Sequence, residues 1–257
     1  MTTIVHDPSR AVPRRTPTVV VGAVAVAWIA ALVSWATGAA TRVNHDGLIH
    51  SGLPLWAAGL IFLFSWQVMI AAMMLPSSVP LIRLYVTVSA AAPRARASLA
   101  AFLAGYAAVW GAFGLGAFLA DTRLHRFVDG HPWLAARPQL IVGSTLLVAG
   151  LFQFSKLKDA CLQQCRNPGA YLMPRYRRGP AAGFGLGRGH GLFCLGCCWA
   201  LMLLMFAVGM TSLLWMAAAG ALMFYEKVGA HGRRVADIAG VALLAAGGIT
   251  LAVPVLT

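Results

Sequence analysis

Apolar residues occur in long runs along this chain, and short polar segments separate the runs. A run of about 18 or more apolar residues can cross the hydrocarbon core of a bilayer, where only a helix satisfies its own backbone groups. The pattern therefore predicts an all-α fold, a polytopic transmembrane helical bundle. About seven membrane helices are expected, at Thr18–Ala40, Trp56–Leu75, Ala97–Ala120, Gln139–Ser155, His190–Met210, Leu213–Tyr225 and Val235–Val255.

One of these helices is predicted to be broken by proline. Pro76 and Pro80 follow the second apolar run directly, and each removes a backbone donor from a helix. The residues beyond them, Leu81 to Val88, are spaced so that they could lie amphipathically on the inner membrane surface.

The remaining polar segments set the expected domain organisation. Residues 1–17 contain three prolines and no long apolar run, so they are predicted to be a disordered cytoplasmic tail. Residues 18–257 are predicted to form a single transmembrane helical domain, with residues 156–189 as a basic, cysteine-containing cytoplasmic loop. Alternating glycines from Gly183 to Gly191 favour a flexible loop that folds closely over the inner face.

Composition and charge support a membrane protein and give its orientation. Hydrophobic residues make up 60% of the chain, charged residues 11%, and the mean hydropathy is +0.76. With a cytoplasmic N-terminus, fifteen of the 20 basic residues lie in inner segments and four in outer ones. The sequence thus predicts a multi-pass protein of the cell's inner (plasma) membrane. The lipid bilayer is its expected partner, and basic loops facing anionic lipid explain the net charge of +13 without nucleic acid.

A periodic series of potential metal ligands starts the fifth predicted helix. His190, Cys194, Cys198, Met202 and Met205 recur every three or four residues and so share one helix face. Imidazole, thiolate and thioether groups are ligands that soft transition metals favour, Cu(I) above all. The alternative interpretation is that cysteine and methionine are apolar fillers of a membrane helix.

Other polar features are expected at the same inner face. Methionines precede the proline break, two cysteines lie one turn apart after the fourth helix, and the only glutamate ends the sixth helix. All five cysteines lie near the reducing cytoplasmic face, which favours thiolate ligands over disulfides. The candidate metal ligands are Cys161, Cys165, His190, Cys194, Cys197 and Cys198, and a second shell or path is expected at Met73, Met74, Met202, Met205 and Glu226. Copper is the expected metal, and zinc is less favoured because Cys-x-x-x-Cys is looser than a zinc clip.

The predicted outer loops contain a second set of possible ligands. His45, His50, His125 and His131 lie there with several aspartates, and nitrogen and oxygen ligands suit Zn(II) or Cu(II). Histidines are also common in solvated loops, so the sequence leaves open whether a second metal binds there.

Three strings of the sequence resemble a known bacterial family. They are Ala71-Ala-Met-Met-Leu-Pro-Ser77, the cysteine string from Leu157 to Pro168, and the string from His190 to Met202. They are similar to predicted metal-binding integral membrane proteins, also called domain of unknown function 2182, over roughly residues 56–250. The resemblance implies a polytopic helical protein with a metal site on the cysteine-rich elements. One departure is Met210-Thr211-Ser212, where such sequences often have Met-Asn.

The sequence therefore predicts a membrane protein that binds a soft transition metal, copper, at its cytoplasmic face for metal handling or metal-centre assembly. A metal chaperone or another membrane subunit would be its partner. One alternative is a membrane redox enzyme with a lipid-soluble substrate, either a metal oxidase or a thiol oxidoreductase that uses Cys197 and Cys198. Another is a structural membrane subunit. Neither a hydrolase triad nor a phosphate-binding loop is visible, and no catalytic residue is assigned.

Overall fold

Helices account for almost all of the chain in the computed structural model, which describes residues 16–208 and 212–253 and has no strand within them. The prediction of an all-α fold is confirmed for this part of the chain. The helices are α1 (Thr18–Ala36), α2 (Ala39–Val43), α3 (His45–Ile49), α4 (Leu55–Met73), α5 (Leu75–Ser89), α6 (Ala95–Asp129), α7 (Pro132–Ala135), α8 (Pro138–Gln153), α9 (Lys156–Arg166), α10 (Pro168–Leu172), α11 (Pro180–Val208), α12 (Leu213–Val228) and α13 (Gly232–Ala252).

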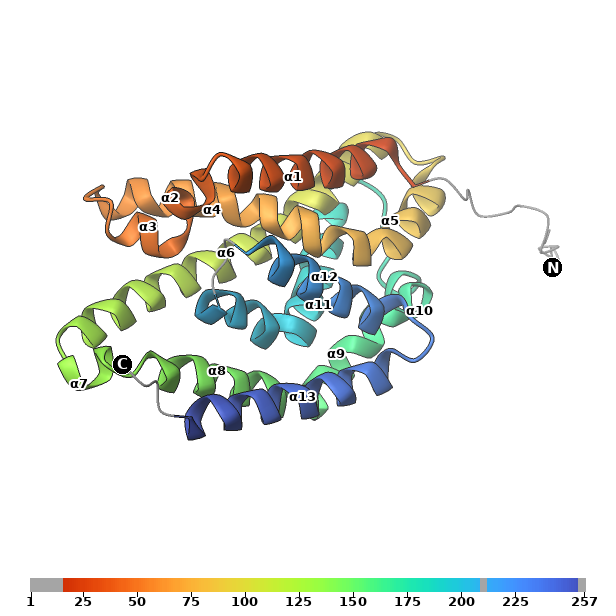
Figure 1. Cartoon of the computed structure of the whole chain (residues 1–257). Coiled ribbons are helices and arrows are strands. Elements are labelled where there is room, and N and C mark those ends of the chain that lie inside the picture. Colours follow the sequence, from red (N-terminus) through yellow and green to blue (C-terminus); the bar gives the residue numbers. More distant parts are fainter. Residues whose placement is uncertain (1–15, 209–211, 254–257) are drawn as a thin grey trace, which may run out of the picture.

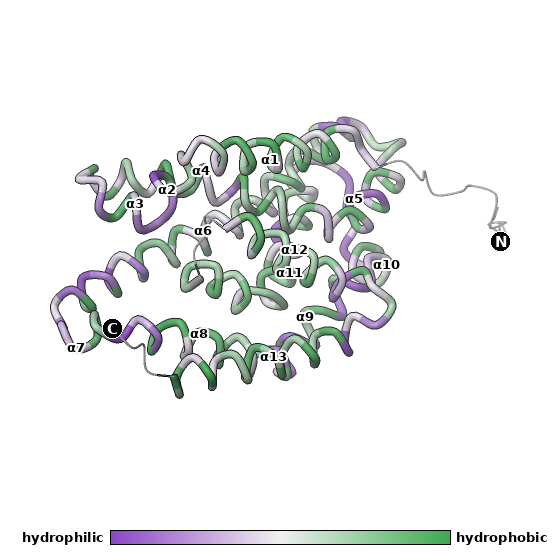
Figure 2. The backbone as a smooth tube through the Cα atoms, viewed as in Figure 1, coloured by the Kyte–Doolittle hydropathy of each residue, from purple (hydrophilic) through white to green (hydrophobic). Residues whose placement is uncertain are grey.

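The long helices form a bundle with the short ones at its two ends (Figure 1). Helices α1 and α4 lie along one side, α8 and α13 along the opposite side, and α11 and α12 between them. The short helices α2, α3 and α7 gather at one end, called here the His end, and α5 and α10 at the other, called the Cys end. Polar residues concentrate at these two ends, while the middle of the bundle is apolar (Figure 2). This distribution suits a bundle that crosses a bilayer.

Among the described residues, five helices are long and apolar enough to cross a membrane, fewer than the seven expected: α1, α4, α6, α11 and α13. The bent pair of α8 and α9, at 63° to one another, would make a sixth. Helix α12 has 16 residues, about 24 Å at 1.5 Å per residue, which is shorter than a hydrocarbon core of about 30 Å. Many large apolar side chains of α1 and α13 point outward, as they would toward lipid.

The glycine-rich segment is helical, which corrects the prediction of a flexible loop. Helix α11 begins at Pro180, ten residues before His190, and residues 156–179 also fold largely into helices α9 and α10. Gly183, Gly187 and Gly191 lie where α11 approaches α6. A Cβ atom at Gly187 would collide with the carbonyl of Phe102, and one at Gly183 would lie 2.5 Å from the carbonyl of Ser98. Glycine here permits close helix packing rather than flexibility.

The proline-containing segment divides two helices at a single residue. Helix α4 ends at Met73, α5 starts at Leu75, and Met74 between them still has helical backbone angles. Pro76 lies in the first turn of α5, where its missing N–H costs little, and Pro80 lies inside the helix. The break predicted near Pro76 is therefore present, and Pro80 does not end the helix.

The first predicted helix is shorter than expected because α1 ends at Ala36 and Gly38 adopts a left-handed conformation with φ of 69°. Two short helices, α2 and α3, occupy the region that follows. Residues 1–15 of the predicted disordered tail, the predicted helix ends at Met210 and Val255, and Met210-Thr211 of the family departure lie outside the described residues.

Candidate metal centre

A buried group of sulfur atoms lies near the Cys end, where α11 and α12 meet the junction of α4 and α5. Cys194 and Cys198 are one turn apart on α11, and the sulfur of Cys198 lies 3.8 Å from the sulfur of Met74. The ammonium of Lys227, from α12, lies 3.0 Å from the sulfur of Cys194, 3.7 Å from that of Met74 and 4.0 Å from that of Cys198. All four side chains are buried. We call these four residues the sulfur–lysine cluster.

The hydrogen bonds distinguish the two thiols of this cluster. The thiol of Cys198 donates to the backbone carbonyl of Cys194 at 2.8 Å. The sulfur of Cys194 instead accepts from the Lys227 ammonium and lies 3.1 Å from the hydroxyl of Tyr106. An ammonium beside a buried sulfur favours its thiolate form, because a buried cation needs an anionic partner. Cys194 thus has the surroundings of a thiolate.

Two serines and a histidine extend the cluster toward the Cys end. The Lys227 ammonium lies 3.4 Å from the hydroxyl of Ser77, and Nε2 of His190 lies 3.0 Å from the hydroxyl of Ser78. Nδ1 of His190 has no hydrogen-bond partner among the described residues. The histidine predicted as a ligand is therefore one helix turn before Cys194 and keeps one nitrogen available.

Helix α10 helps to fix α11 in this region. The hydroxyl of Tyr171 donates to the carbonyl of Leu186 at 2.7 Å, and its ring lies 5.7 Å from the ring of His190. Burial raises the pKa of Tyr171 to about 12, so this hydroxyl remains a donor at any physiological pH.

The other three cysteines form a second thiol group between α9 and α11. The thiols of Cys165 and Cys197 are neighbours, and the sulfur of Cys161 packs against Gly196. Cys161 and Cys165 therefore do approach the cysteine-rich part of α11. All five cysteines are free thiols. No three of their sulfurs lie mutually within 4.8 Å, so they do not form one compact ligand set in the described structure.

A buried ion pair lies beside the cluster. The carboxylate of Glu226 accepts a hydrogen bond from Lys158 at 2.7 Å, and both side chains are buried. Glu226 therefore points into the bundle, where its carboxylate is paired with Lys158. Adjacent residues of α12 thus contact different elements: Glu226 pairs with Lys158 of α9, whereas Lys227 contacts the sulfurs of Met74 and of Cys194 on α11.

The remaining predicted methionines are buried in the same core. Met202 and Met205 follow Cys198 on α11, and Met73 packs against Gly220 of α12. Met69, Met216 and Met223 join them there, although the sequence did not single them out.

Sequence reasoning missed the central role of Lys227 in the cluster. It follows a run of apolar residues in α12, and an ionisable residue next to such a run is commonly functional. This signal was available, but it gave no partner for the ammonium.

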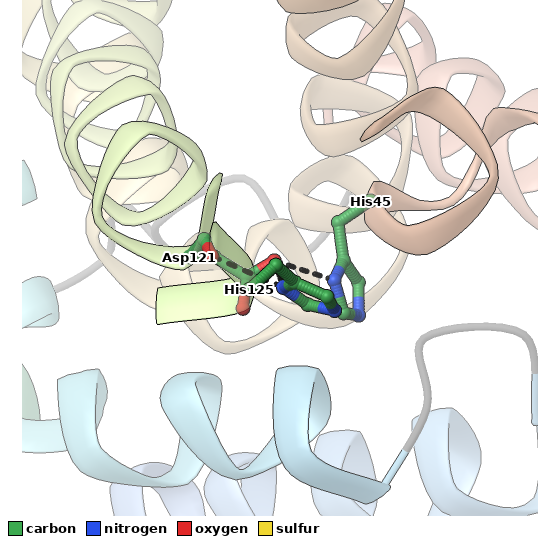
Figure 3. A group of neighbouring side chains, drawn as sticks. All are labelled: His45, Asp121 and His125. Atoms are coloured by element: carbon green, nitrogen blue, oxygen red, sulfur yellow. Dashed lines mark hydrogen bonds and ion pairs between the residues drawn. The ribbon is translucent and has the colours of Figure 1, made fainter. Parts of the chain in front are cut away.

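A second group of potential ligands lies at the His end, shown in Figure 3. His45 comes from α3, and Asp121 and His125 come from one turn of α6. One ligand atom from each lies within 4.8 Å of the others, and no other His, Cys, Asp or Glu group of the described chain meets this condition.

Buried sulfur donors among apolar helices, with histidines at the other end, define a helical protein suited to handling a soft transition metal. The family model described as PpoB2, copper chaperone, matches residues 63–250. Because this match covers more than half of the chain, the chain belongs to that copper chaperone family. The copper-related character inferred from the sequence is thereby confirmed at the level of the family. No curated protein and no solved structure matches the chain.

Proposed function

We propose that the protein is an integral membrane copper chaperone that holds Cu(I) at the sulfur–lysine cluster, with Cys194 and Cys198 as thiolate ligands and Met74 as a thioether ligand. The observation that carries this proposal is the contact of Cys198 with Met74 beside Cys194, within reach of one ammonium. Two or three sulfur donors in an apolar enclosure suit Cu(I) better than harder ions.

The charge of the cluster supports a monovalent ion. Two thiolates and one Cu(I) carry a net charge of −1, and the Lys227 ammonium brings the buried group to neutrality. A divalent ion in the same place would leave a buried excess positive charge, which is unfavourable in an apolar surrounding.

Neighbouring groups offer routes for transfer. The second thiol group of Cys161, Cys165 and Cys197 lies against α11 on the side of α9, and His190 lies one turn toward the Cys end. Met202 and Met205 extend in the other direction along the helix. We propose that copper passes between the cluster and a metal chaperone or another membrane subunit along these residues.

The membrane placement belongs to this proposal. Five or six apolar helices support insertion, and the basic residues near the Cys end favour the cytoplasmic side of the inner (plasma) membrane for that end. We also propose that the family of domain of unknown function 2182 and the copper chaperone family matched here are related, since both resemblances cover nearly the same residues.

A thiol oxidoreductase is the second candidate, because one observation favours it. Cys165 and Cys197 are neighbouring free thiols on different helices. The adjacent pair Cys197 and Cys198 is less suitable, because side chains of successive helix residues point about 100° apart and a disulfide between them is strained. An oxidoreductase would form a disulfide between Cys165 and Cys197 and hold no metal.

Elemental analysis of the full chain purified in detergent tests the copper site. The wild type, reconstituted with Cu(I) under reducing conditions, is expected to hold one copper ion in the cluster, and the Cys194→Ser, Cys198→Ser double variant is expected to lose it. Met173→Leu is the matched control, because Met173 is exposed and outside the cluster. Separate Cys161→Ser and Cys165→Ser variants show whether the second thiol group shares the ion. Full copper content in the double variant would contradict the proposed site.

A further inference from the structure

The His end holds a compact set of nitrogen and oxygen donors far from the sulfurs. Nδ1 of His45 lies 2.7 Å from Oδ2 of Asp121, and Nδ1 of His125 lies 3.5 Å from the same oxygen. Asp121 and His125 are one turn apart on α6, so a rigid helix fixes their spacing. Figure 3 shows the three side chains converging from α3 and α6.

His45 carries an unused donor atom in a buried place. Its side chain is only 3% exposed, and its Nε2 has no hydrogen-bond partner among the described residues. A buried imidazole nitrogen without a partner costs free energy, which a ligand at this position would recover.

A cavity provides room beside these side chains. Its volume is about 420 Å³, and His45, Asp46, Asp121 and His125 contribute to its lining. Apolar residues of α6, α8 and α11 form most of the remainder, and no lysine or arginine lines it. A cation in the cavity therefore meets no competing positive charge.

The charge balance of the group favours a divalent ion. Asp46 lies 2.9 Å from Nε2 of His125 and 3.4 Å from Nδ1 of His45, so two carboxylates and two imidazoles lie together. With neutral imidazoles, the group has a charge of −2. Asp46 is half exposed and can orient the histidines as an outer partner, an arrangement that is common around protein metal sites.

The donor chemistry separates this group from the sulfur–lysine cluster. Imidazole and carboxylate suit Zn(II) and Cu(II), whereas thiolate and thioether suit Cu(I). The two places are also distinct in space. The ring of Phe206 on α11 lies 5.0 Å from the ring of His45, and Cys198 is about 12 Å earlier along that helix.

From these observations we infer that His45, Asp121 and His125 form a second metal site, for a divalent ion of the Cu(II) or Zn(II) type. Three protein ligands leave a coordination position open toward the cavity, as in sites that exchange ligands. The competing explanation is a structural clamp, in which the His45–Asp121 hydrogen bond only ties α3 to α6.

Cu(II) titration of the full-length Cys194→Ser, Cys198→Ser protein in detergent tests the inference, since removing these thiols limits reduction of the ion. One Cu(II) per chain is expected, with nitrogen hyperfine coupling in its electron paramagnetic resonance spectrum. His45→Gln and His125→Gln, added singly, should each weaken binding at least tenfold. His131→Gln is the matched control, because this exposed histidine lies nearby but outside the group.

Thermal unfolding without metal separates a site from a clamp. Metal binding that is lost in a variant with unchanged unfolding temperature supports the site. Unchanged Cu(II) affinity in the His45→Gln, His125→Gln combination overturns the proposed site. So does a failure of the Cys194→Ser, Cys198→Ser protein to bind Cu(II). If the Cys194→Ser, Cys198→Ser protein does not fold, Co(II) added to the wild type replaces the probe, because thiolate and nitrogen–oxygen coordination give different absorption spectra. Cu(II) is measured in a protein without Cys194 and Cys198, and Co(II) at the two sites gives different spectra. The result of this test is therefore independent of the result of the Cu(I) test.

Discussion

At the scale of single residues, the charges buried near the Cys end are arranged in two separate sets. Lys227 lies among sulfur atoms, while its neighbour Glu226 pairs with Lys158. A buried charge is tolerated only with a partner, so each set constrains the side chains around it. Substitutions in the cluster are therefore expected to change copper affinity, and substitutions in the ion pair to change stability.

Replacing Lys227 with methionine should weaken Cu(I) binding at least tenfold. The variant leaves a copper bis-thiolate with a buried charge of −1 that nothing neutralises. Competition with a Cu(I) chelator measures the affinity, and Lys156→Met is the control because Lys156 is exposed at the start of α9. Tighter binding in Lys227→Met would mean that the ammonium competes with copper for the sulfurs.

Replacing Glu226 with glutamine should destabilise the fold by about 3–5 kcal/mol, because Lys158 would then be buried without an anion. The free energy of unfolding in detergent measures this effect. Asp237→Asn is the control, since Asp237 belongs to a half-exposed pair with Arg233 and should change stability by no more than about 1 kcal/mol. Equal losses of unfolding free energy for the two substitutions would show that the buried pair stabilises the fold no more than the half-exposed pair does.

At the scale of elements, the packing of α6 against α11 positions the cluster. Close approach depends on Gly105 of α6 and on Gly183, Gly187 and Gly191 of α11, each of which faces atoms of the other helix. Tyr106, next to Gly105, reaches Cys194 across this contact. The glycines thus hold the cysteine-rich turn at a fixed distance from α6.

Gly187→Ala should destabilise the protein by about 1–3 kcal/mol or more, since its Cβ would meet the backbone of Phe102 and force the helices apart. The same substitution at Gly185 is the matched control. A Cβ there meets nothing within 4 Å, and alanine favours the helix by about 1 kcal/mol. Thermal unfolding in detergent compares the two, and a Gly187→Ala protein as stable as Gly185→Ala would contradict the close-packing role.

At the scale of the whole molecule, the two ends differ in chemistry. The Cys end carries thiols, a buried ammonium and most of the basic residues, and the His end carries imidazoles and carboxylates. An apolar middle separates them (Figure 2). A bilayer around this middle would place soft and hard ligands on opposite sides of the membrane.

This orientation predicts a C-terminus on the outer side and the α5–α6 connection inside. An alkaline phosphatase fused after Thr257 should be active, since the enzyme folds only outside the cytoplasm, and one fused within residues 90–94 should be inactive. The asymmetry of basic residues is the physical reason. An inactive fusion at the C-terminus with an active one at residues 90–94 would invert the assignment.

The sequence by itself determined the class of fold and pointed to most of the residues that we propose as ligands. Apolar run length dictates helices, because backbone groups in an apolar surrounding must bond within their own segment. The spacing of Cys194 and Cys198 places both on one helix face whatever surrounds the helix. For the same reason, Cys161 and Cys165 were expected together, and α9 carries them on adjacent turns.

Only the tertiary structure decided which of these residues meet. Cys194 and Cys198 lie with Met74 and Lys227, whereas the thiol of Cys197 neighbours both Cys198 and Cys165 of α9, because the cysteines of α11 face different helices. The glycine-rich segment was expected to be a loop, since glycine alone weakens a helix. It is helical, and α6 packs so closely against Gly183, Gly187 and Gly191 that a side chain there would meet atoms of α6. The spacing of residues determines which side chains share one face of a helix, because helix geometry is local. Which other helix that face contacts depends on the packing of segments far apart in the sequence.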